Sequence, residues 1–311
     1  MILVGDIGGT NTRLALAVTA DDGVRLEHER YFRTPPDLAP LIRDYLAAAN
    51  RAAPAAAALC GAGPLRADGS IHLTNVDCTL EPSAIGTAAG VGRALIVNDF
   101  EAVAQAIPAL TPDQLRACGG GTGDARAPRI VLGAGTGLGI ASLLPHSGEW
   151  IVIPGEGGHV DLAPVNDEEL IVWQRLRQTS DRVSAEMVLS GSGLQRLYHA
   201  LCGSTLDSPS ITKAATAGDV AAHRALHLFT RWLGRVAGNA ALTLGARGGV
   251  YVAGGIVPAW GEHFDAVQFR AGFEDKAPFA GWLAEIPSFV VTHPQPALLG
   301  LARLATRQSK I

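Results

Sequence analysis

"ILVGDIGGTNTRLALAV", residues 2–18, places a glycine turn between two apolar runs at the start of the chain. Ile2–Val4 and Arg13–Val18 each favour a β-strand, and the turn "GDIGGTN" between them predicts a hairpin. The backbone amides of such a turn, together with its Thr and Asn side chains, can bond several phosphate oxygens, and Asp6 would then face a metal ion. An ordinary hairpin turn is the alternative, because glycine and asparagine are common there.

A second turn of this kind, "GAGTGLG" at residues 133–139, follows the apolar run "RIVL" and leads into Ile140–Leu144. It repeats the opening order of strand, glycine turn and strand, without a repeat at the level of individual residues. The dinucleotide pattern GxGxxG fails at Leu138, and the chain contains no GxxxxGK[ST] phosphate loop. Neither of the two common nucleotide-binding folds is therefore indicated.

"ALIVNDFEAVAQAI", residues 94–107, changes its hydrophobic period in the middle. Ala94–Val97 is a continuous apolar run typical of a buried strand, and the apolar residues after it repeat at helical spacing. Asn98 and Asp99 therefore stand at a strand-to-helix junction, where a helix N-cap is the commoner role for such residues. Because ligands in open α/β sheets bind at the carboxyl ends of strands, Asp99 could instead orient a substrate hydroxyl and accept its proton.

"PGEGGHVDLAP", residues 154–164, places Glu156 and His159 three positions apart. On a helix that spacing would suit metal ligands, but the glycines and Pro154 argue against a helix. A loop that offers hydrogen-bond acceptors and a donor to a polyol is favoured, and a purely structural loop is the alternative. Taken alone, Glu186 is a surface helix charge and Asn75 in "LTN" is a turn residue.

The composition indicates a globular α/β protein with a small-molecule partner. The 311 residues are 48% hydrophobic, with 37 glycines and 18 prolines, and this length allows two domains that each bury a core. A net charge of -4 with both signs interspersed gives no electrostatic footprint for nucleic acid or an anionic membrane. No apolar run reaches the length of a membrane span and no cationic leader opens the chain, which predicts a cytosolic protein. The four cysteines form no CxxC pair, so neither a disulfide framework nor a zinc knuckle is indicated.

The polar, glycine-rich segment from Thr111 to Arg129 is the candidate domain boundary or a flexible excursion. The order strand, strand, helix, strand that precedes it is typical of an α/β domain. Pro296 begins a last helix, because proline is favoured in the first turn and leucines follow at helical spacing.

Seven motifs occur in order along the chain: "LVGDIGGTNTRLAL", "LTN", "LIVNDFEAVAQAIP", "VLGAGTGLGIA", "PGEGGHVDLAP", "VSAEMVLSGSGL" and "GGVYVAGGIVP". Together they resemble the bacterial glucokinase family of the hexokinase and actin-like ATPase superfamily, from Leu3 to about Gly300. The resemblance implies an α/β, two-domain actin-like ATPase (ribonuclease H-like) fold, with a central mixed sheet in each domain and the active site in the interdomain cleft. It further implies a small domain of residues 1–110 plus 298–311 and a large domain of residues 111–297.

The resemblance also implies the roles of individual residues. ATP would be bound by Gly5, Asp6, Ile7, Gly8, Gly9, Thr10, Asn11, Gly135, Thr136, Gly137, Gly254 and Gly255, with Asp6 holding Mg²⁺ through water. Glucose would be bound by Asn75, Asn98, Asp99, Glu156, His159 and Glu186, with Asp99 as the catalytic base. The implied reaction is the ATP-dependent phosphorylation of D-glucose at the 6-hydroxyl to glucose 6-phosphate and ADP, at the entry to glycolysis, by a cytoplasmic homodimer.

Two departures from the family pattern keep alternatives open. Cys78 stands near the position where family members commonly have a Trp after "LTN", which leaves another hexose, such as mannose or an N-acetylated sugar, as an alternative substrate. "GGHVDLAPVNDEEL" contains no cysteine, which argues against the zinc-bearing branch of the wider repressor-and-kinase family and leaves His159 for the sugar. A sugar-sensing or actin-like binding protein without catalysis is the second alternative, and the presence of Asp6 and Asp99 argues against it.

Overall fold

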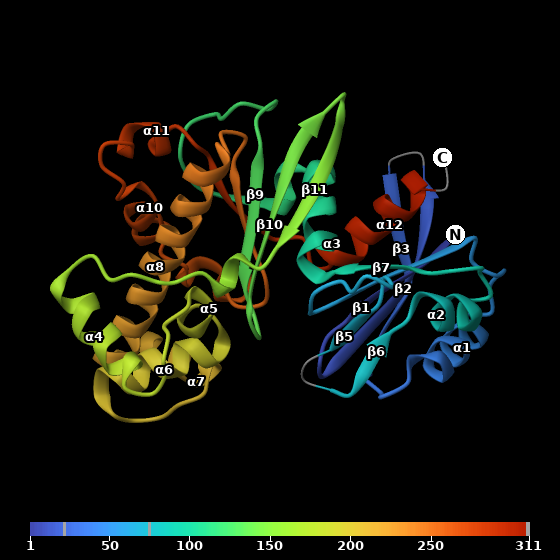
Figure 1. The fold of residues 1–311 in the computed structure, drawn as a ribbon, viewed down its shortest axis with the longest axis horizontal. Coiled ribbons are helices and arrows are strands. Elements are labelled where there is room, and N and C mark those ends of the chain that lie inside the picture. Colours follow the sequence, from blue (N-terminus) through green and yellow to red (C-terminus); the bar gives the residue numbers. More distant parts are fainter. Residues whose placement is uncertain (21–22, 74–75, 309–311) are drawn as a thin grey trace. The chain divides into compact units, whose positions relative to one another are not determined.

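The structure is a computed structural model that describes residues 1–20, 23–73 and 76–308, and it divides into two compact units. Unit 1 is Met1–Leu110 with His293–Ile311, and unit 2 is Thr111–Thr292. Each unit has its own mixed β-sheet and its own hydrophobic core (Figure 1). The predicted α/β class with a mixed sheet in each half is confirmed. Within the described ranges, every helix is too short or too polar to cross a membrane.

Unit 1 contains a five-stranded sheet and a separate two-stranded hairpin. Its strands are β1 (Ile2–Ile7), β2 (Asn11–Ala20), β3 (Gly23–Arg33), β4 (Ala56–Gly61), β5 (Ile71–Leu73), β6 (Cys78–Leu80) and β7 (Leu95–Asn98). Its helices are α1 (Leu38–Ala49), α2 (Pro82–Ala89), α3 (Asp99–Ala106), the 3-10 helix η1 (Ile107–Ala109) and α12 (Pro296–Gln308). The sheet order is β3-β2-β1-β4-β7, with antiparallel pairs among β1, β2 and β3 and parallel pairs from β1 to β4 and from β4 to β7.

The parallel register of unit 1 brings three strand ends to one edge of the sheet. Asp6 of β1 is level with Cys60 of β4, and Gly61 is level with Asn98 of β7. Asp99 follows directly and begins α3 at that edge. Because ligands of α/β sheets bind outside the carboxyl ends of the strands, this edge is where a site is expected.

Helix α12 fixes the position of α3 within unit 1. A Cβ on Gly300 of α12 would lie 1.8 Å from the carbonyl oxygen of Ala102 in α3, so the two helix backbones are in direct contact. Only glycine allows this approach. The last helix of the chain therefore supports the helix that carries Asp99 (Figure 1).

Unit 2 contains a six-stranded sheet in the order β11-β10-β9-β12-β13-β8. Its strands are β8 (Leu115–Gly119), β9 (Arg129–Ala134), β10 (Leu138–His146), β11 (Glu149–Gly155), β12 (Val250–Ala253) and β13 (Ser288–Val291). Its α-helices are α4 (Asp167–Arg177), α5 (Ala185–Val188), α6 (Gly191–Cys202), α7 (Ser208–Thr216), α8 (Val220–Leu244), α9 (Val257–Trp260), α10 (Ala266–Glu274) and α11 (Ala280–Ala284). Its 3-10 helices are η2 (Pro112–Gln114), η3 (Gly157–His159) and η4 (Gly261–His263).

The two sheets share one topology, since in both an antiparallel three-stranded meander leads into strands that run parallel to its first strand. The predicted repeat of strand, glycine turn and strand is thus a repeat of architecture. β8 departs from expectation, because it is a regular strand within the polar segment 111–129, which the sequence predicts to be a domain boundary or a flexible excursion. It pairs antiparallel with β13, which no local pattern could indicate.

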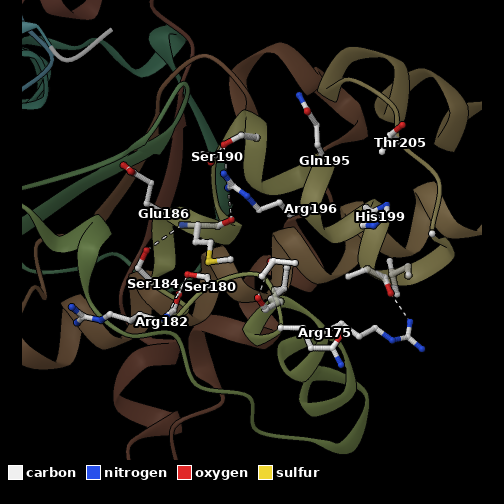
Figure 2. Close-up of a pocket in the computed structure, with 18 of the residues that line it drawn as sticks. Arg175, Ser180, Arg182, Ser184, Glu186, Ser190, Gln195, Arg196, His199 and Thr205 are labelled. Atoms are coloured by element: carbon white, nitrogen blue, oxygen red, sulfur yellow. Dashed lines mark hydrogen bonds between the residues drawn. The ribbon is translucent and has the colours of Figure 1, made fainter.

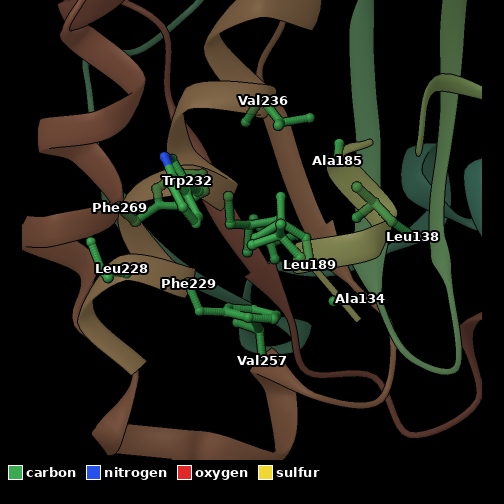
Figure 3. Close-up of a cluster of buried hydrophobic side chains, with 14 of the residues drawn as sticks. Ala134, Leu138, Ala185, Leu189, Leu228, Phe229, Trp232, Val236, Val257 and Phe269 are labelled. Carbon is green, nitrogen blue, oxygen red and sulfur yellow. The ribbon is translucent and has the colours of Figure 1, made fainter. Parts of the chain in front are cut away.

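The core of unit 2 holds α5 against β10. Leu138 of β10, Ala185 of α5, Leu189 directly after α5 and Phe229 of α8 belong to one cluster of buried side chains (Figure 3). Leu189 and Phe229 are fully buried, and burying one such side chain contributes about 1.5–3 kcal/mol. A helix of four residues would not form alone, so packing is what fixes α5.

Candidate functional site

The turn between β1 and β2 directs its carbonyl groups into unit 1. The N–H of Gly8 donates to the carbonyl of Asn11 at 2.9 Å. The carbonyl of Gly8 accepts from the Thr34 hydroxyl at 2.6 Å, and the carbonyl of Thr10 accepts from the Thr34 N–H at 2.9 Å. The N–H groups of Gly9 and Thr10 have no partner among the described residues, which leaves them available to an anion.

Asp6 lies at the end of β1, beside this turn. Its Oδ2 is 3.3 Å from Nη1 of Arg13, and its Oδ1 is 3.7 Å from Sγ of Cys60. Burial raises the pKa of Asp6 above its ordinary value, and the charge of Arg13 opposes that rise. The side chain remains 25% exposed, so the carboxylate can reach a ligand.

Asn98 is the N-cap of α3. Its Oδ1 accepts from the N–H groups of Phe100 at 2.9 Å and Glu101 at 3.3 Å, and its Nδ2 donates to the carbonyl of Gly63 at 3.1 Å. The capping role that was the alternative for Asp99 therefore belongs to its neighbour.

Asp99 is the first residue of α3, and its Oδ1 accepts from the N–H of Phe100 at 2.9 Å. The positive end of the helix dipole favours a negative charge at this position. Burial raises the pKa of the Cys60 thiol well above its ordinary value, and the charges of Asp6 and Asp99 raise it further. The strand register places Asp6 and Asp99, the predicted metal and base residues, at the same carboxyl end of the unit 1 sheet.

The turn between β9 and β10 is the corresponding feature of unit 2. Its Gly135 N–H donates to the carbonyl of Gly137 at 2.8 Å, and the carbonyl of Gly135 accepts from the N–H of Gly191 at 2.9 Å. Gly254 approaches from β12 with a φ of 83°, and a Cβ there would lie 2.5 Å from the carbonyl oxygen of Ala134. The predicted nucleotide residues 135–137 and 254–255 therefore lie together in unit 2, and their contact with ATP stays a prediction.

Two segments bring this cluster together, since Glu156 and His159 belong to the η3 turn and Glu186 belongs to α5. Nε2 of His159 is 4.0 Å from Oε2 of Glu156 and 4.0 Å from Oε1 of Glu186. The other oxygen of Glu186, Oε2, accepts from the N–H of Leu138 at 2.8 Å. The side chains of Glu156 and His159 are 59% and 61% exposed. Two carboxylates and an imidazole thus face solvent as hydrogen-bonding groups suited to a polyol.

Backbone contacts hold the two segments of this cluster in place. The N–H of Ala185 donates to the carbonyl of Val160 at 2.9 Å, and the N–H of Leu162 donates to the carbonyl of Val183 at 3.0 Å. A Cβ on Gly158 would lie 2.1 Å from the carbonyl oxygen of Leu138, so glycine lets the segment rest on β10. Residues 157–159 form one 3-10 turn rather than the α-helix that the metal-ligand reading needs.

A pocket of 1290 Å³ opens beside the cluster and lies entirely in unit 2. Thr136, His159 and Glu186 line it, and so do Arg175 and Arg196 from α4 and α6 (Figure 2). The guanidinium of Arg196 donates to the carbonyl of Met187 at 3.0 Å and to the hydroxyl of Ser192 at 3.2 Å. Sequence reasoning missed these arginines, because on a helix they look like ordinary surface charges.

The predicted site residues thus fall into two groups, one in each unit. Asn75 lies outside the described residues. Cys78, which stands near the family's usual Trp, is 1% exposed in the core of unit 1 and so cannot itself contact a sugar. The described residues contain no cluster of three or more His, Cys, Asp or Glu side chains arranged to hold a metal ion.

Comparison with known proteins finds similarity along nearly the whole chain. The family described as glucokinase matches residues 3–308. The glucokinase of Ralstonia nicotianae is 44% identical over 323 aligned positions, which cover 96% of this chain and 93% of that protein. The crystal structure of glucokinase from an Antarctic psychrotroph has a TM-score of 0.87 at 32% identity and covers 98% of both chains. That of Balamuthia mandrillaris glucokinase in complex with glucose has a TM-score of 0.82 at 27% identity, over 98% of this chain and 93% of that one.

Proposed function

The chain belongs to the glucokinase family of ATP-dependent hexose kinases, and from that premise we propose that it transfers the γ-phosphoryl group of ATP to the 6-hydroxyl of glucose. The observation that carries the proposal is the convergence of Glu156 and Glu186 on His159, whose Nε2 lies 4.0 Å from a carboxylate oxygen of each. Glucose offers only hydroxyl and ether groups, and these three side chains supply acceptors and a donor for them.

Sugar selectivity follows from the same cluster. Each glucose hydroxyl would meet one fixed polar atom, and an epimer with one hydroxyl inverted would leave a donor or acceptor unpaired, at about 1–3 kcal/mol for each group. Asn98 adds a donor, because only one of its two Nδ2 hydrogens is needed for the carbonyl of Gly63. Asn75 is assigned to the same sugar site on the family resemblance alone.

Asp99 is the proposed catalytic base. Phosphoryl transfer passes through a loose transition state, in which positioning of the reacting groups and neutralisation of charge contribute most of the acceleration. Asp99 orients the 6-hydroxyl through a hydrogen bond and accepts its proton late in the step. A carboxylate at a helix N-terminus is a weak base, which is sufficient when deprotonation need not precede attack.

The two glycine turns are the proposed phosphate-binding elements. In unit 1 the unpartnered amides of Gly9 and Thr10 are available to phosphate oxygens, and in unit 2 the turn 135–137 occupies the corresponding position in its sheet. Gly5, Ile7, Gly8 and Asn11 shape the first turn, and Gly254 and Gly255 are assigned to the adenosine.

Asp6 fits a role in holding Mg²⁺. Mg²⁺ prefers carboxylate oxygens, keeps several waters and is bound by few protein ligands when phosphates complete its coordination. A single, partly exposed carboxylate beside a phosphate turn matches that donor set. Mg²⁺ bound with ATP supplies neutralisation of the phosphate charge.

A panel of hexoses with ATP and Mg²⁺, followed by coupled detection of ADP, tests the proposal. Glucose should give the highest kcat/KM, and turnover with mannose or an N-acetylated sugar but not with glucose would overturn it. Asp99→Asn should retain glucose binding and lose most turnover, whereas Asp44→Asn on the exposed side of α1 should match the wild type. A near-normal kcat in Asp99→Asn would reject Asp99 as the base.

The proposal extends to the assembly and its location. The family resemblance implies a homodimer, which light scattering coupled to size exclusion would measure. Consumption of ATP for the entry to glycolysis implies the cytoplasm.

A further inference from the structure

Thr34 belongs to none of the sequence motifs, yet it donates two hydrogen bonds to the β1–β2 turn. It follows the last residue of β3 and is 8% exposed. Its N–H donates to the carbonyl of Thr10 at 2.9 Å, and its hydroxyl donates to the carbonyl of Gly8 at 2.6 Å. The hydroxyl of Thr12, which is fully buried, lies 3.0 Å from the Thr34 hydroxyl.

The direction of these hydrogen bonds is fixed by chemistry. A carbonyl oxygen only accepts, so the single hydroxyl hydrogen of Thr34 is committed to Gly8. The Thr34 oxygen must then accept from Thr12, which makes Thr12 the donor of the 3.0 Å contact. The result is a chain of donors from Thr12 through Thr34 to Gly8, and a satisfied buried chain of this kind is rigid.

The hydrogen bonds of Thr34 determine which backbone groups of the turn remain available to a ligand. The carbonyls of Gly8, Thr10 and Asn11 all accept hydrogen bonds from within unit 1, and two of the three accept from Thr34. The amides of Gly9 and Thr10, by contrast, have no partner in the part of the chain that the structure describes. A phosphate group is attracted by N–H groups and repelled by carbonyl oxygens, so a turn that fixes its carbonyls inward is prepared for an anion.

We propose that Thr34 is a positioning residue for the nucleotide, which holds the carbonyls of the β1–β2 turn away from the phosphates and its amides toward them. The inference rests on the proposed function, since it takes the anion to be the polyphosphate of ATP. Thr34 itself does not touch the ligand. Its effect passes through the backbone of Gly8 and Thr10.

Thr34→Val is the decisive variant, because valine keeps the shape of threonine and removes only the hydroxyl. It retains the N–H bond to Thr10 and loses both hydroxyl contacts. The dissociation constant for a non-hydrolysable ATP analogue with Mg²⁺, measured by calorimetry, should rise about fivefold to tenfold, a change within the range that the loss of one internal hydrogen bond produces. The KM for ATP should rise with it, while the KM for glucose stays within about twofold of the wild type.

Thr34→Ser and Thr306→Val serve as matched controls. Serine retains the hydroxyl and should restore nucleotide affinity to within about twofold. Thr306 on α12 also donates its hydroxyl to a backbone carbonyl, that of Ala302 at 2.8 Å, but it lies away from the turn, so Thr306→Val should leave nucleotide binding unchanged. In Thr12→Val the bond from Thr34 to Gly8 survives, so its effect should be smaller than that of Thr34→Val, and the double variant should be no worse than Thr34→Val alone.

Several results would overturn the inference. The first is an unchanged nucleotide affinity in a folded Thr34→Val variant. The second is an equal increase in the KM for ATP and the KM for glucose together with a loss of thermal stability, because this would indicate a merely structural role. Failure of the wild type to phosphorylate glucose would instead refute the proposed function. Calorimetry with the ATP analogue needs no turnover, so it keeps the two failures apart.

Discussion

Replacing Gly137 with alanine should weaken glucose binding through Glu186, which is distant in the chain but accepts a hydrogen bond from the neighbouring Leu138 N–H. The new Cβ would lie 2.4 Å from Oε2 of Glu186, whereas ordinary contact begins at 3.4 Å. The carboxylate must retreat by about 1.0 Å, the difference between those distances, and this stretches the 2.8 Å bond from the Leu138 N–H beyond hydrogen-bonding range. A hydrogen bond to a charged group is worth about 1.5–3 kcal/mol, so the dissociation constant for glucose should rise about 10- to 100-fold.

Calorimetry with glucose alone is the appropriate assay, because Gly137 is also assigned to ATP and a measurement without nucleotide excludes that effect. The variant should fold, since the atom that must move is the end of a flexible side chain. Gly281→Ala in α11 is the control, because its Cβ would meet nothing within 4 Å. If the effect passes through Glu186, then adding Gly137→Ala to Glu186→Gln should cost no further affinity. A glucose affinity within twofold of the wild type, or full additivity with Glu186→Gln, would refute the reasoning.

Three further predictions concern stability. Arg235→Met should lower the free energy of unfolding by about 3–5 kcal/mol in urea denaturation, because it leaves the buried Glu169 carboxylate without the guanidinium that binds it at 2.6 and 3.0 Å. Burial would raise the pKa of Glu169, but the hydrogen bonds and charge of Arg235 lower that pKa overall. The ionised Glu169 therefore contributes stability above the unfolded-state pKa, and this contribution is lost as the pH falls through the lowered folded-state pKa. The wild type should therefore lose more stability than a Glu169→Gln, Arg235→Met double variant between about pH 5 and pH 3, and parallel losses would contradict this. Gly300→Ala should lower the melting temperature and kcat together. Its Cβ would lie 1.8 Å from the Ala102 carbonyl oxygen and push α12 away from α3, the helix that carries Asp99. An unchanged melting temperature would contradict this prediction.

Features that depend on local sequence were predictable. Both glycine turns follow from apolar runs on either side of a glycine-rich segment, and the junction at Asp99 follows from a change of hydrophobic period. The sequence did not predict which residue at that junction caps the helix. A shift of one residue in the start of α3 decides whether Asn98 or Asp99 is the N-cap. Such boundaries depend on the register of β7 against β4, which pairs Asn98 with Gly61.

Features that depend on distant pairing were not predictable from local pattern. β8 forms because β13, from the far end of unit 2, pairs with it, and its own segment is polar and rich in glycine. Glu186 alone reads as a surface charge, and only the family resemblance assigned it to the sugar. The structure supplies the physical reason for its position, which is the bond from the Leu138 N–H beside a glycine that leaves room for the carboxylate.

Different groups bind the carbonyl oxygens of the two glycine turns, a side-chain hydroxyl in unit 1 and a backbone N–H in unit 2. This difference explains why no sequence motif pointed to Thr34. A turn that is to bind phosphate must keep its carbonyl oxygens away from the ligand. In unit 2 the carbonyl of Gly135 is held by the N–H of Gly191 at the start of α6, so any residue except proline could donate this bond. In unit 1 the carbonyl of Gly8 is held by the Thr34 side chain, so the identity of the residue matters. Removal of the Thr34 hydroxyl should therefore impair the unit 1 turn, whereas a substitution at Gly191 by any residue other than proline should leave the carbonyl of Gly135 bound.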